Sequence, residues 1–315
     1  MKAIIIRQFG ERDVLELADI PKPKIQPGEV LVKIVAAGVN PVDWKIRKGL
    51  LKGRMPYELP ITLGWEASGV IDEVGSEVKN FEKGDAVFAY TRKEKIHDGS
   101  YAEFIALEPR HLVLKPKNLS FEESAAIPLA GLTAYQSLFE SLQLQNGEKI
   151  LIHAGAGGVG SFAIQLAKTI GAYTITTASE KNHDYVRKLG TDEVIDYTKE
   201  DFVKAVLNKH PEGIDAVFDT VGDETQKKSA DVLKKGGRLT SLLALDEEFF
   251  KKKGLKPGYV FVRPEPSHLD RLRKLIEEDR LKVSLFQIFP ISEVKRAHEA
   301  IETGHVRGKI VLRIG

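Results

Sequence analysis

The stretch KILIHAGAGGVGSFAIQLAK, residues 149–168, decides the fold class of this chain. Within it, Gly155-x-Gly157-x-x-Gly160 follows an apolar run directly and opens a helical pattern, a context typical of a dinucleotide site. The first glycine permits a tight turn, the second lets a pyrophosphate approach the backbone, and the third lets the helix pack on the strand. Free N–H groups at the helix N-terminus would bind the phosphates. A purely structural turn is the alternative, but we assign the whole loop to cofactor binding: Gly155, Ala156, Gly157, Gly158, Val159 and Gly160.

Five more strand-like runs follow this loop. They are YTITTA (173–178), EVIDY (193–197), IDAVFDT (214–220), RLTSLLA (238–244) and GYVFVRP (258–264). Helical stretches such as SFAIQLAKTI (161–170) alternate with them, which predicts a doubly wound parallel sheet of the Rossmann type in an α/β protein. We expect residues 122–264 to form this domain, with Leu243 and Ala244 among its cofactor contacts.

Residues 1 to about 120 have a different pattern. Short alternating or β-branched runs such as EVLVKIVAAGV (29–39) and GDAVFAY (84–90) are cut by Gly, Pro and Asp, as in antiparallel strands. After the sixth Rossmann strand come two helical stretches, about 266–279 and 292–303, and the run GKIVLRI (308–314). This surplus after a complete core suggests that the chain returns to its first domain. We therefore expect residues 1–121 and 265–315 to form a second, mostly antiparallel β domain.

Composition predicts a globular protein without a membrane span. Hydrophobic residues make up 42% and charged residues 29%, and no apolar run could cross a bilayer. The net charge of +2 is too weak to nominate nucleic acid as a partner. The absence of cysteine excludes disulfides and thiolate zinc sites. Since the first apolar run, at 3–6, is also too short for a signal peptide, we expect a cytoplasmic location.

The residues after the second strand bear on the choice between NAD and NADP. NAD sites place an acidic residue there, on the ribose 2′-OH. Here Ser179 leaves room for a 2′-phosphate, and Lys181 can meet its charge. Glu180 is the counter-evidence, since it could accept the 2′-OH of NAD. We favour NADP(H), with Tyr197 as a further phosphate or adenine contact, although a surface aromatic is the alternative for that residue.

Across essentially its whole length the chain resembles the zinc-free, zeta-crystallin-like quinone oxidoreductase branch of the medium-chain dehydrogenase/reductases. The resemblance rests on AAGVNPVDWKIRKG (36–49), GWEASGVIDEVGSEVKNFEKGDAVF (64–88), GLTAYQSL (131–138), the glycine-loop segment (146–168) and GHVRGKIVL (304–312). It implies a GroES-like catalytic domain built from both chain ends, with the cofactor in the cleft beside the Rossmann domain. It also implies a homodimer, for which GYVFVRP, the sixth Rossmann strand, is the candidate interface.

The zinc ligands of metal-dependent relatives are missing from this sequence. Those relatives place a cysteine in the segment matching GVNPVD, a histidine in G-H-E-x-x-G, and another cysteine near the domain junction. Asn40 and Trp65 occupy the first two positions here, and neither carboxamide nor indole replaces thiolate or imidazole on zinc. We therefore predict no metal, and hydride transfer to a quinone or an α,β-unsaturated carbonyl, whose oxygen takes up the incoming charge. The alternatives are an NADPH-binding protein that interacts with RNA, and an enoyl-thioester reductase.

The family places several of these segments near the nicotinamide, and they supply the candidate catalytic residues. Lys45 is the first candidate for holding the carbonyl oxygen or a cofactor hydroxyl, Asn40 for orienting the acceptor, and Asp43 for orienting a neighbour. Turn capping by Asn40 and Asp43 and a solvated Lys45 carry equal weight as alternatives. Tyr57, in the loop MPYELP, is another candidate acid, and Thr133 is expected to contact the nicotinamide.

Two polar residues, Glu66 and His153, stand in apolar stretches of the sequence. For Glu66, in GWEASG, we expect a buried carboxylate whose partner is a backbone N–H or a nearby cation. His153, at the end of the first Rossmann strand, is interpreted as a core residue, because nothing in the sequence pairs it with a nucleophile.

Overall fold

A computed structural model describes the whole chain, residues 1–315. It divides into two compact units, which are described separately. Unit 1 comprises Met1–Leu132, Arg263–Glu278 and Val283–Gly315, and unit 2 comprises Thr133–Val262 and Asp279–Lys282. None of the helices combines the length and the apolar character that a membrane crossing requires.

Unit 2 is built on a six-stranded parallel sheet in the order β11-β10-β9-β12-β13-β14. The strands are β9 (Lys149–Ile152), β10 (Tyr173–Thr177), β11 (Glu193–Ile195), β12 (Ile214–Asp219), β13 (Leu233–Ser241) and β14 (Lys256–Tyr259). The order of the strands reverses between β9 and β12, which are neighbours. Open parallel sheets bind ligands at the carboxyl ends of their strands at such a point. The predicted doubly wound sheet is confirmed.

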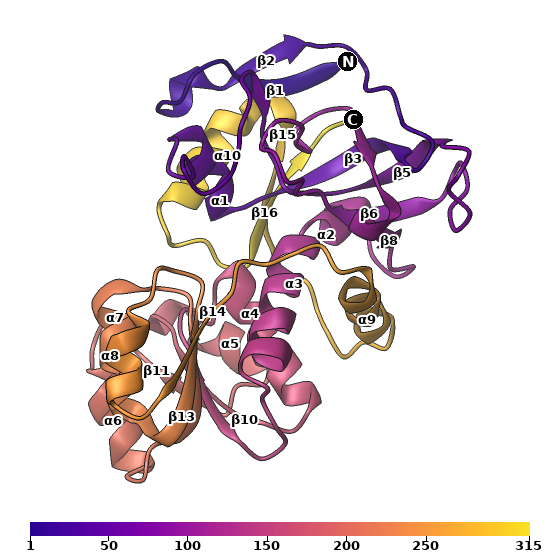
Figure 1. Cartoon of the computed structure of the whole chain (residues 1–315). Coiled ribbons are helices and arrows are strands. Elements are labelled where there is room, and N and C mark those ends of the chain that lie inside the picture. Colours follow the sequence, from indigo (N-terminus) through magenta and orange to yellow (C-terminus); the bar gives the residue numbers. More distant parts are fainter. The chain divides into compact units, whose positions relative to one another are not determined.

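Helices cover both faces of this sheet. They are α4 (Gly158–Thr169), α5 (His183–Lys188), α6 (Phe202–Lys209), α7 (Asp223–Lys228) and α8 (Glu247–Lys252). Helices α4 and α5 lie on one face, and α6, α7 and α8 lie on the other (Figure 1). On the second face Phe202 and Phe250 pack against strand residues such as Val217 and Leu239. The strands are nearly continuous apolar runs because both faces are buried.

Unit 1 contains two β-sheets. The larger has the order β15-β16-β3-β5-β6-β8, with β7 paired to β3, and the smaller has the order β2-β1-β4. The strands are β1 (Lys2–Ile6), β2 (Glu16–Asp19), β3 (Val30–Val39), β4 (Ile61–Thr62), β5 (Glu66–Val74), β6 (Ala86–Tyr90), β7 (Phe104–Leu107), β8 (Leu112–Leu114), β15 (Leu285–Pro290) and β16 (Lys309–Arg313). All pairs are antiparallel except β15 with β16. Because β16 pairs with β3, the last strand of the chain joins the same sheet as strands from its first third.

Four helices belong to unit 1: α1 (Pro41–Arg47), α2 (Phe121–Ala125), α9 (Pro266–Glu277) and α10 (Val294–Glu302). A fifth, α3 (Pro128–Tyr135), begins in unit 1 and ends in unit 2. Helix α1 starts at a proline, which suits the first helical position. The Asp43 carboxylate in its first turn accepts the Asn40 N–H at 2.8 Å, which satisfies one backbone donor at the helix start.

Strands β14 and β15 differ most from the predicted elements. Strand β14 spans residues 256–259 rather than 258–264, because its pairing with β13 runs from Arg238↔Lys256 to Ser241↔Tyr259 and the apolar residues that follow lie beyond it. Strand β15, LFQIFP, is absent from the prediction and adds to the sheet by parallel pairing with β16.

Candidate active site

The glycine loop connects β9 to α4 at the carboxyl edge of the parallel sheet. A Cβ atom at Gly155 would collide with Thr176 Oγ1, and one at Gly160 with the carbonyl oxygen of Ala154. A Cβ atom at Gly157 would meet only that carbonyl oxygen, at 3.3 Å. Packing within the protein therefore requires the outer two glycines. The middle one leaves open the approach to the N-terminus of α4, where unpaired N–H groups can bind phosphate, so the loop fits a dinucleotide.

The residues that follow β10 carry mixed charges. Ser179 is half-buried, and the exposed Glu180 carboxylate lies 2.7 Å from Lys199 Nζ. Lys181 is exposed and forms no ion pair. The carboxylate that could accept a ribose 2′-OH thus already has a cationic partner, while a lysine beside it has none. Tyr197, after β11, is 52% exposed.

Leu243 and Ala244 follow β13 at the same sheet edge. The Leu243 N–H donates to Ser241 Oγ at 3.0 Å, and the Ala244 carbonyl accepts from Gln226 Nε2 at 3.2 Å. Thr133 is buried in α3 and belongs to unit 2, as do all the other predicted cofactor residues. The strand ends therefore bring the glycine loop, Ser179 and residues 243–244 to one edge.

Glu66 lies at the start of β5 and is fully buried in unit 1. Its Oε1 accepts hydrogen bonds from Asn40 Nδ2 and from Lys309 Nζ, both at 2.7 Å, and its Oε2 accepts the Leu129 N–H at 2.7 Å. The Lys309 ammonium, itself 4% exposed, also donates to Asn40 Oδ1. Both kinds of partner expected for Glu66, a backbone N–H and a cation, are present.

Asp43 is completely buried nearby. Its Oδ2 accepts the Asn40 N–H at 2.8 Å and the Tyr101 hydroxyl at 2.9 Å, while its Oδ1 has no hydrogen-bond partner. Burial raises the pKa of Asp43 to about 7, because the charged form loses hydration that two neutral donors do not replace. These bonds fit the predicted role of orienting a neighbour.

Lys45 and Tyr57 take no part in this hydrogen-bond network. Lys45, on α1, is half-buried, pairs with no carboxylate and has its Nζ 5.7 Å from the Trp44 ring centroid. Burial, and then the nearby Arg54, lower its pKa. Tyr57 is 43% exposed and packs edge-on against Phe9, with ring centroids 5.0 Å apart. The structure thus joins Asn40 with Asp43 but not with the two other candidates.

Comparison with known proteins identifies the family. The family model described as an alcohol dehydrogenase GroES-like domain matches residues 26–117, and one described as a zinc-binding dehydrogenase matches residues 189–312. The chain is 39% identical to an NADPH-dependent alkenal/one oxidoreductase of Arabidopsis thaliana, covering 99% of this chain and 79% of that protein. The chain belongs to the medium-chain dehydrogenase/reductase family.

Solved structures agree with membership of the medium-chain dehydrogenase/reductases. The quinone oxidoreductase of Coxiella burnetii has a TM-score of 0.92 at 39% identity, with 100% of this chain and 99% of that one covered. The Escherichia coli quinone oxidoreductase complexed with NADPH has a TM-score of 0.90 at 29% identity, with both chains fully covered. The predicted pairing of a GroES-like domain with a Rossmann domain is confirmed.

The donors in this medium-chain dehydrogenase/reductase do not fit the zinc that the second family description implies. The chain has no cysteine, and both ends of the Asn40 amide are engaged by Glu66 and Lys309. The Trp65 indole offers no lone pair for a metal and is 5% exposed, with the Arg92 guanidinium 5.9 Å from its ring centroid. Trp65 fills volume in the core of unit 1.

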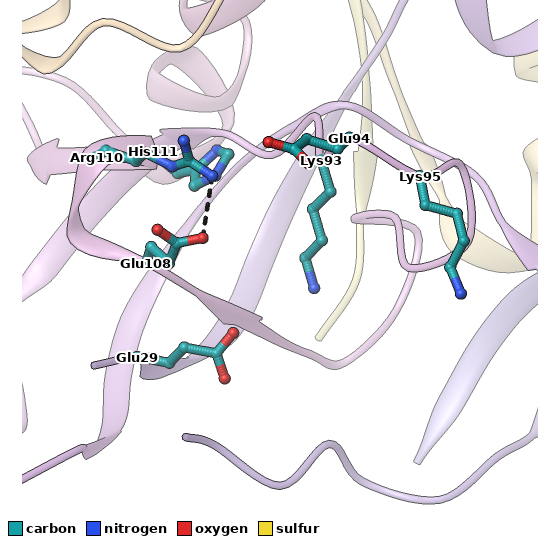
Figure 2. Close-up of a pocket in the computed structure, with 7 residues that line it drawn as sticks. All are labelled: Glu29, Lys93, Glu94, Lys95, Glu108, Arg110 and His111. Atoms are coloured by element: carbon teal, nitrogen blue, oxygen red, sulfur yellow. Dashed lines mark hydrogen bonds and ion pairs between the residues drawn. The ribbon is translucent and has the colours of Figure 1, made fainter. Parts of the chain in front are cut away.

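A pocket of about 370 Å³ elsewhere in unit 1 contains none of the candidate residues (Figure 2). Its wall has mixed charges, and Arg110 donates to Glu108 at 3.1 Å. His111 in this wall bonds the Tyr90 carbonyl through Nδ1 at 2.9 Å, and burial lowers its pKa. This histidine has its partner within the protein, and the pocket gathers charges of both signs rather than a set of convergent donors.

Lys309 and Tyr101 also belong to the buried network, and neither was predicted from the sequence. Lys309 stands in GKIVLRI, where a lysine between a glycine and an apolar run could have drawn attention. Its partner Glu66 is 243 residues away along the chain, so no local pattern connects the two. His153 is a buried residue, as interpreted, and bonds Ser229 Oγ at 2.9 Å.

Proposed function

We propose that this chain is an NADPH-dependent oxidoreductase that reduces a quinone or an α,β-unsaturated carbonyl without a metal ion. One observation carries the proposal: the glycine loop keeps the approach to α4 open at Gly157. It does so in a chain 39% identical to an NADPH-dependent alkenal/one oxidoreductase. The N–H groups of Gly158, Val159 and Gly160 would hold the pyrophosphate. When bound, NADPH supplies the hydride.

The preference for NADPH over NADH rests on the charges after β10. An NAD site needs a free carboxylate for the 2′-OH, and Glu180 is paired with Lys199. Lys181 has no ion pair, and Ser179 beside it is small and neutral. A 2′-phosphate would therefore meet cations and no unpaired acid at this edge.

Lys45 is our candidate for stabilising the acceptor oxygen. A carbonyl gains negative charge on oxygen as it is reduced, and a hydrogen-bond donor there lowers the barrier. Lys45 has no carboxylate to hold its ammonium, and burial lowers its pKa, which makes the ammonium a stronger proton donor than that of an exposed lysine. Asn40 has one N–H left to orient an acceptor, because Glu66 and Lys309 use the rest of its amide.

Consumption of NADPH in the presence of an acceptor panel tests this function. The panel contains quinones, enals and enones, and an enoyl thioester for the third candidate activity. We expect turnover with quinones or enones, and a fall of about tenfold or more in kcat on Lys45→Met, with Lys33→Met, an exposed change on β3, as control. Good NADPH binding with no turnover of any acceptor would overturn the catalytic claim.

A homodimer through β14 is the quaternary structure that we propose. β14 pairs only with β13, so its outer edge has free backbone groups. Tyr259 at the end of β14 is 42% exposed, and Phe261, just beyond the strand, is 41% exposed. Unpaired edges with apolar side chains favour strand pairing. Light scattering should give a dimer mass for the wild type and a monomer mass for Phe261→Glu; a monomeric wild type would contradict the proposal.

Three further expectations remain proposals. The first is a cytoplasmic location, which imaging of a tagged chain tests. The second is the division of the chain into two domains, residues 1–121 with 265–315 and residues 122–264, which predicts first cuts by limited proteolysis near those limits.

The third is RNA binding, which remains the alternative function. A basic pocket of about 320 Å³ in unit 2, lined by Lys168, Lys188 and Lys282 among others, is where salt-dependent RNA binding would be tested first.

A further inference from the structure

A buried polar cluster connects the ends of two neighbouring strands in unit 2. Asp219 ends β12, Ser241 ends β13, and these two residues are paired in the sheet register. Both are fully buried, and Gln226 from α7 is 4% exposed. We define these three residues as the strand-end cluster. It lies where buried polar groups are tolerated only if they are hydrogen-bonded.

Asp219 is the centre of the strand-end cluster. Its Oδ1 accepts the N–H groups of Val221 at 3.0 Å and Gly222 at 2.9 Å. Its Oδ2 accepts the Ser241 hydroxyl at 2.7 Å and Gln226 Nε2 at 3.1 Å. Four donors thus hold one carboxylate, and these bonds fix the turn after β12.

Ser241 and Gln226 extend the cluster to the loop after β13. Ser241 Oγ accepts the Leu243 N–H at 3.0 Å, and Gln226 Nε2 donates to the Ala244 carbonyl at 3.2 Å. A Cβ atom at Gly222 would lie 2.6 Å from Leu243 Cδ1, so the two loops also pack directly. Loops 220–222 and 242–244 are therefore held together around Asp219.

Loops 220–222 and 242–244 lie beside the glycine loop. β12 is the neighbour of β9 at the point where the strand order reverses, and Thr220 Oγ1 donates to the His153 carbonyl, just before the glycine loop, at 3.0 Å. Ser179 and Lys181, the residues proposed to meet the 2′-phosphate, follow β10 on the other side of β9. A dinucleotide with its pyrophosphate on α4 and its adenosine over β10 would extend its other half over the ends of β12 and β13.

We propose that Asp219, Gln226 and Ser241 are positioning residues that hold loops 220–222 and 242–244 in place for the nicotinamide half of NADPH. The inference rests on the proposed function. None of the three side chains needs to touch the cofactor, since all are buried beneath the loops that they hold. Their loss should weaken binding of the nicotinamide half and misalign it for hydride transfer, while the adenosine half binds normally.

Two probes separate these effects: NADPH, and 2′,5′-ADP, which contains only the adenosine half with its 2′-phosphate. Asp219→Asn puts an NH2 group against donors on one side of the cluster, so we expect NADPH to bind about tenfold more weakly or worse, with lower kcat. Affinity for 2′,5′-ADP should stay within about twofold. Asp223→Asn, which changes an exposed acid in the first turn of α7, is the matched control and should behave as the wild type.

Gln226→Met and Ser241→Ala are milder variants that decide the matter if Asp219→Asn does not fold. The proposal is wrong if the variants that fold bind NADPH as the wild type does, or if they lose NADPH and 2′,5′-ADP affinity equally. If the wild-type chain bound neither probe, the proposed function would itself fail, and this inference with it. A wild type that binds both, with variants that show no difference between the probes, removes only the positioning role.

Discussion

The buried Asp43 predicts how the stability of unit 1 depends on pH. Burial raises its pKa from 3.8 to about 7, so between these values the folded protein keeps a proton that the unfolded chain has released. The free energy of unfolding must therefore fall as pH rises through this range, by about 1.4 kcal/mol per pH unit. Over the interval of about 3 units the loss is about 4 kcal/mol, and it stops growing above about pH 7.

Asp43→Asn removes this titration and retains the shape. One oxygen can still accept from the Asn40 N–H and from Tyr101, because both bonds go to Oδ2. Relative to the wild type, the variant should gain about 4 kcal/mol between pH 4 and pH 7.5. Urea unfolding followed by tryptophan fluorescence measures this gain in the right unit, since both tryptophans, Trp44 and Trp65, lie in unit 1.

Taking the difference between variant and wild type removes the other groups that titrate in this range. Burial lowers the pKa of His298 to about 3, so that group makes the fold more stable as pH rises, in both proteins alike. Asp19→Asn, an exposed change on β2, serves as control and should run parallel to the wild type. A parallel curve for Asp43→Asn, within about 1 kcal/mol, would refute the claim that the folded protein holds a proton on Asp43.

Three further predictions concern the glycine loop, the pair of Glu66 and Lys309, and Ser179. Gly157→Ala should keep the melting temperature of the wild type but bind NADPH at least about tenfold more weakly in titrations. Gly160→Ala should have a lower melting temperature, because its Cβ atom would collide with the Ala154 carbonyl oxygen. Equal melting temperatures for the two variants would contradict this. Glu66→Gln leaves the Lys309 ammonium buried without its charge partner and should cost about 3–5 kcal/mol in urea unfolding; adding Lys309→Met should recover part of that, and no recovery would argue against the pairing. Ser179→Asp places a carboxylate beside the 2′-phosphate position, so the ratio of kcat/KM for NADPH over NADH should fall about tenfold or more, and an unchanged ratio would reject the 2′-phosphate assignment.

The Rossmann half could be read from the sequence because its signals are local. A glycine loop between an apolar strand and a helix, followed by alternating strands and helices, predicts a doubly wound parallel sheet. Strand β14 shows the limit of that reasoning: GYVFVRP has the stronger strand pattern, yet pairing with β13 places the strand at 256–259. Strand β15 was missed because a six-residue apolar run can be a strand or a buried helical turn.

The buried network of unit 1 could be predicted only in part. The position of Glu66 in an apolar run called for a partner, which the sequence could describe by chemistry alone. Lys309 supplies it from β16, and the two meet because β16 and β5 both pair with β3. The unusual state of Asp43 depends on Tyr101 and on complete burial, neither of which a capping position at the start of a helix reveals.

Glu66 and Asp43, two buried carboxylates of unit 1, differ in their hydrogen-bond partners. The difference bears on which residue can supply a proton to the acceptor. Glu66 has an ammonium and two N–H donors, so its charge is compensated. Asp43 has two neutral donors and an oxygen without a partner, so it carries a proton near pH 7. Yet that proton lies in a fully buried site, whereas Lys45 is only half-buried and free of carboxylates. Accessibility, rather than pKa alone, therefore favours Lys45 as the group that meets the acceptor oxygen.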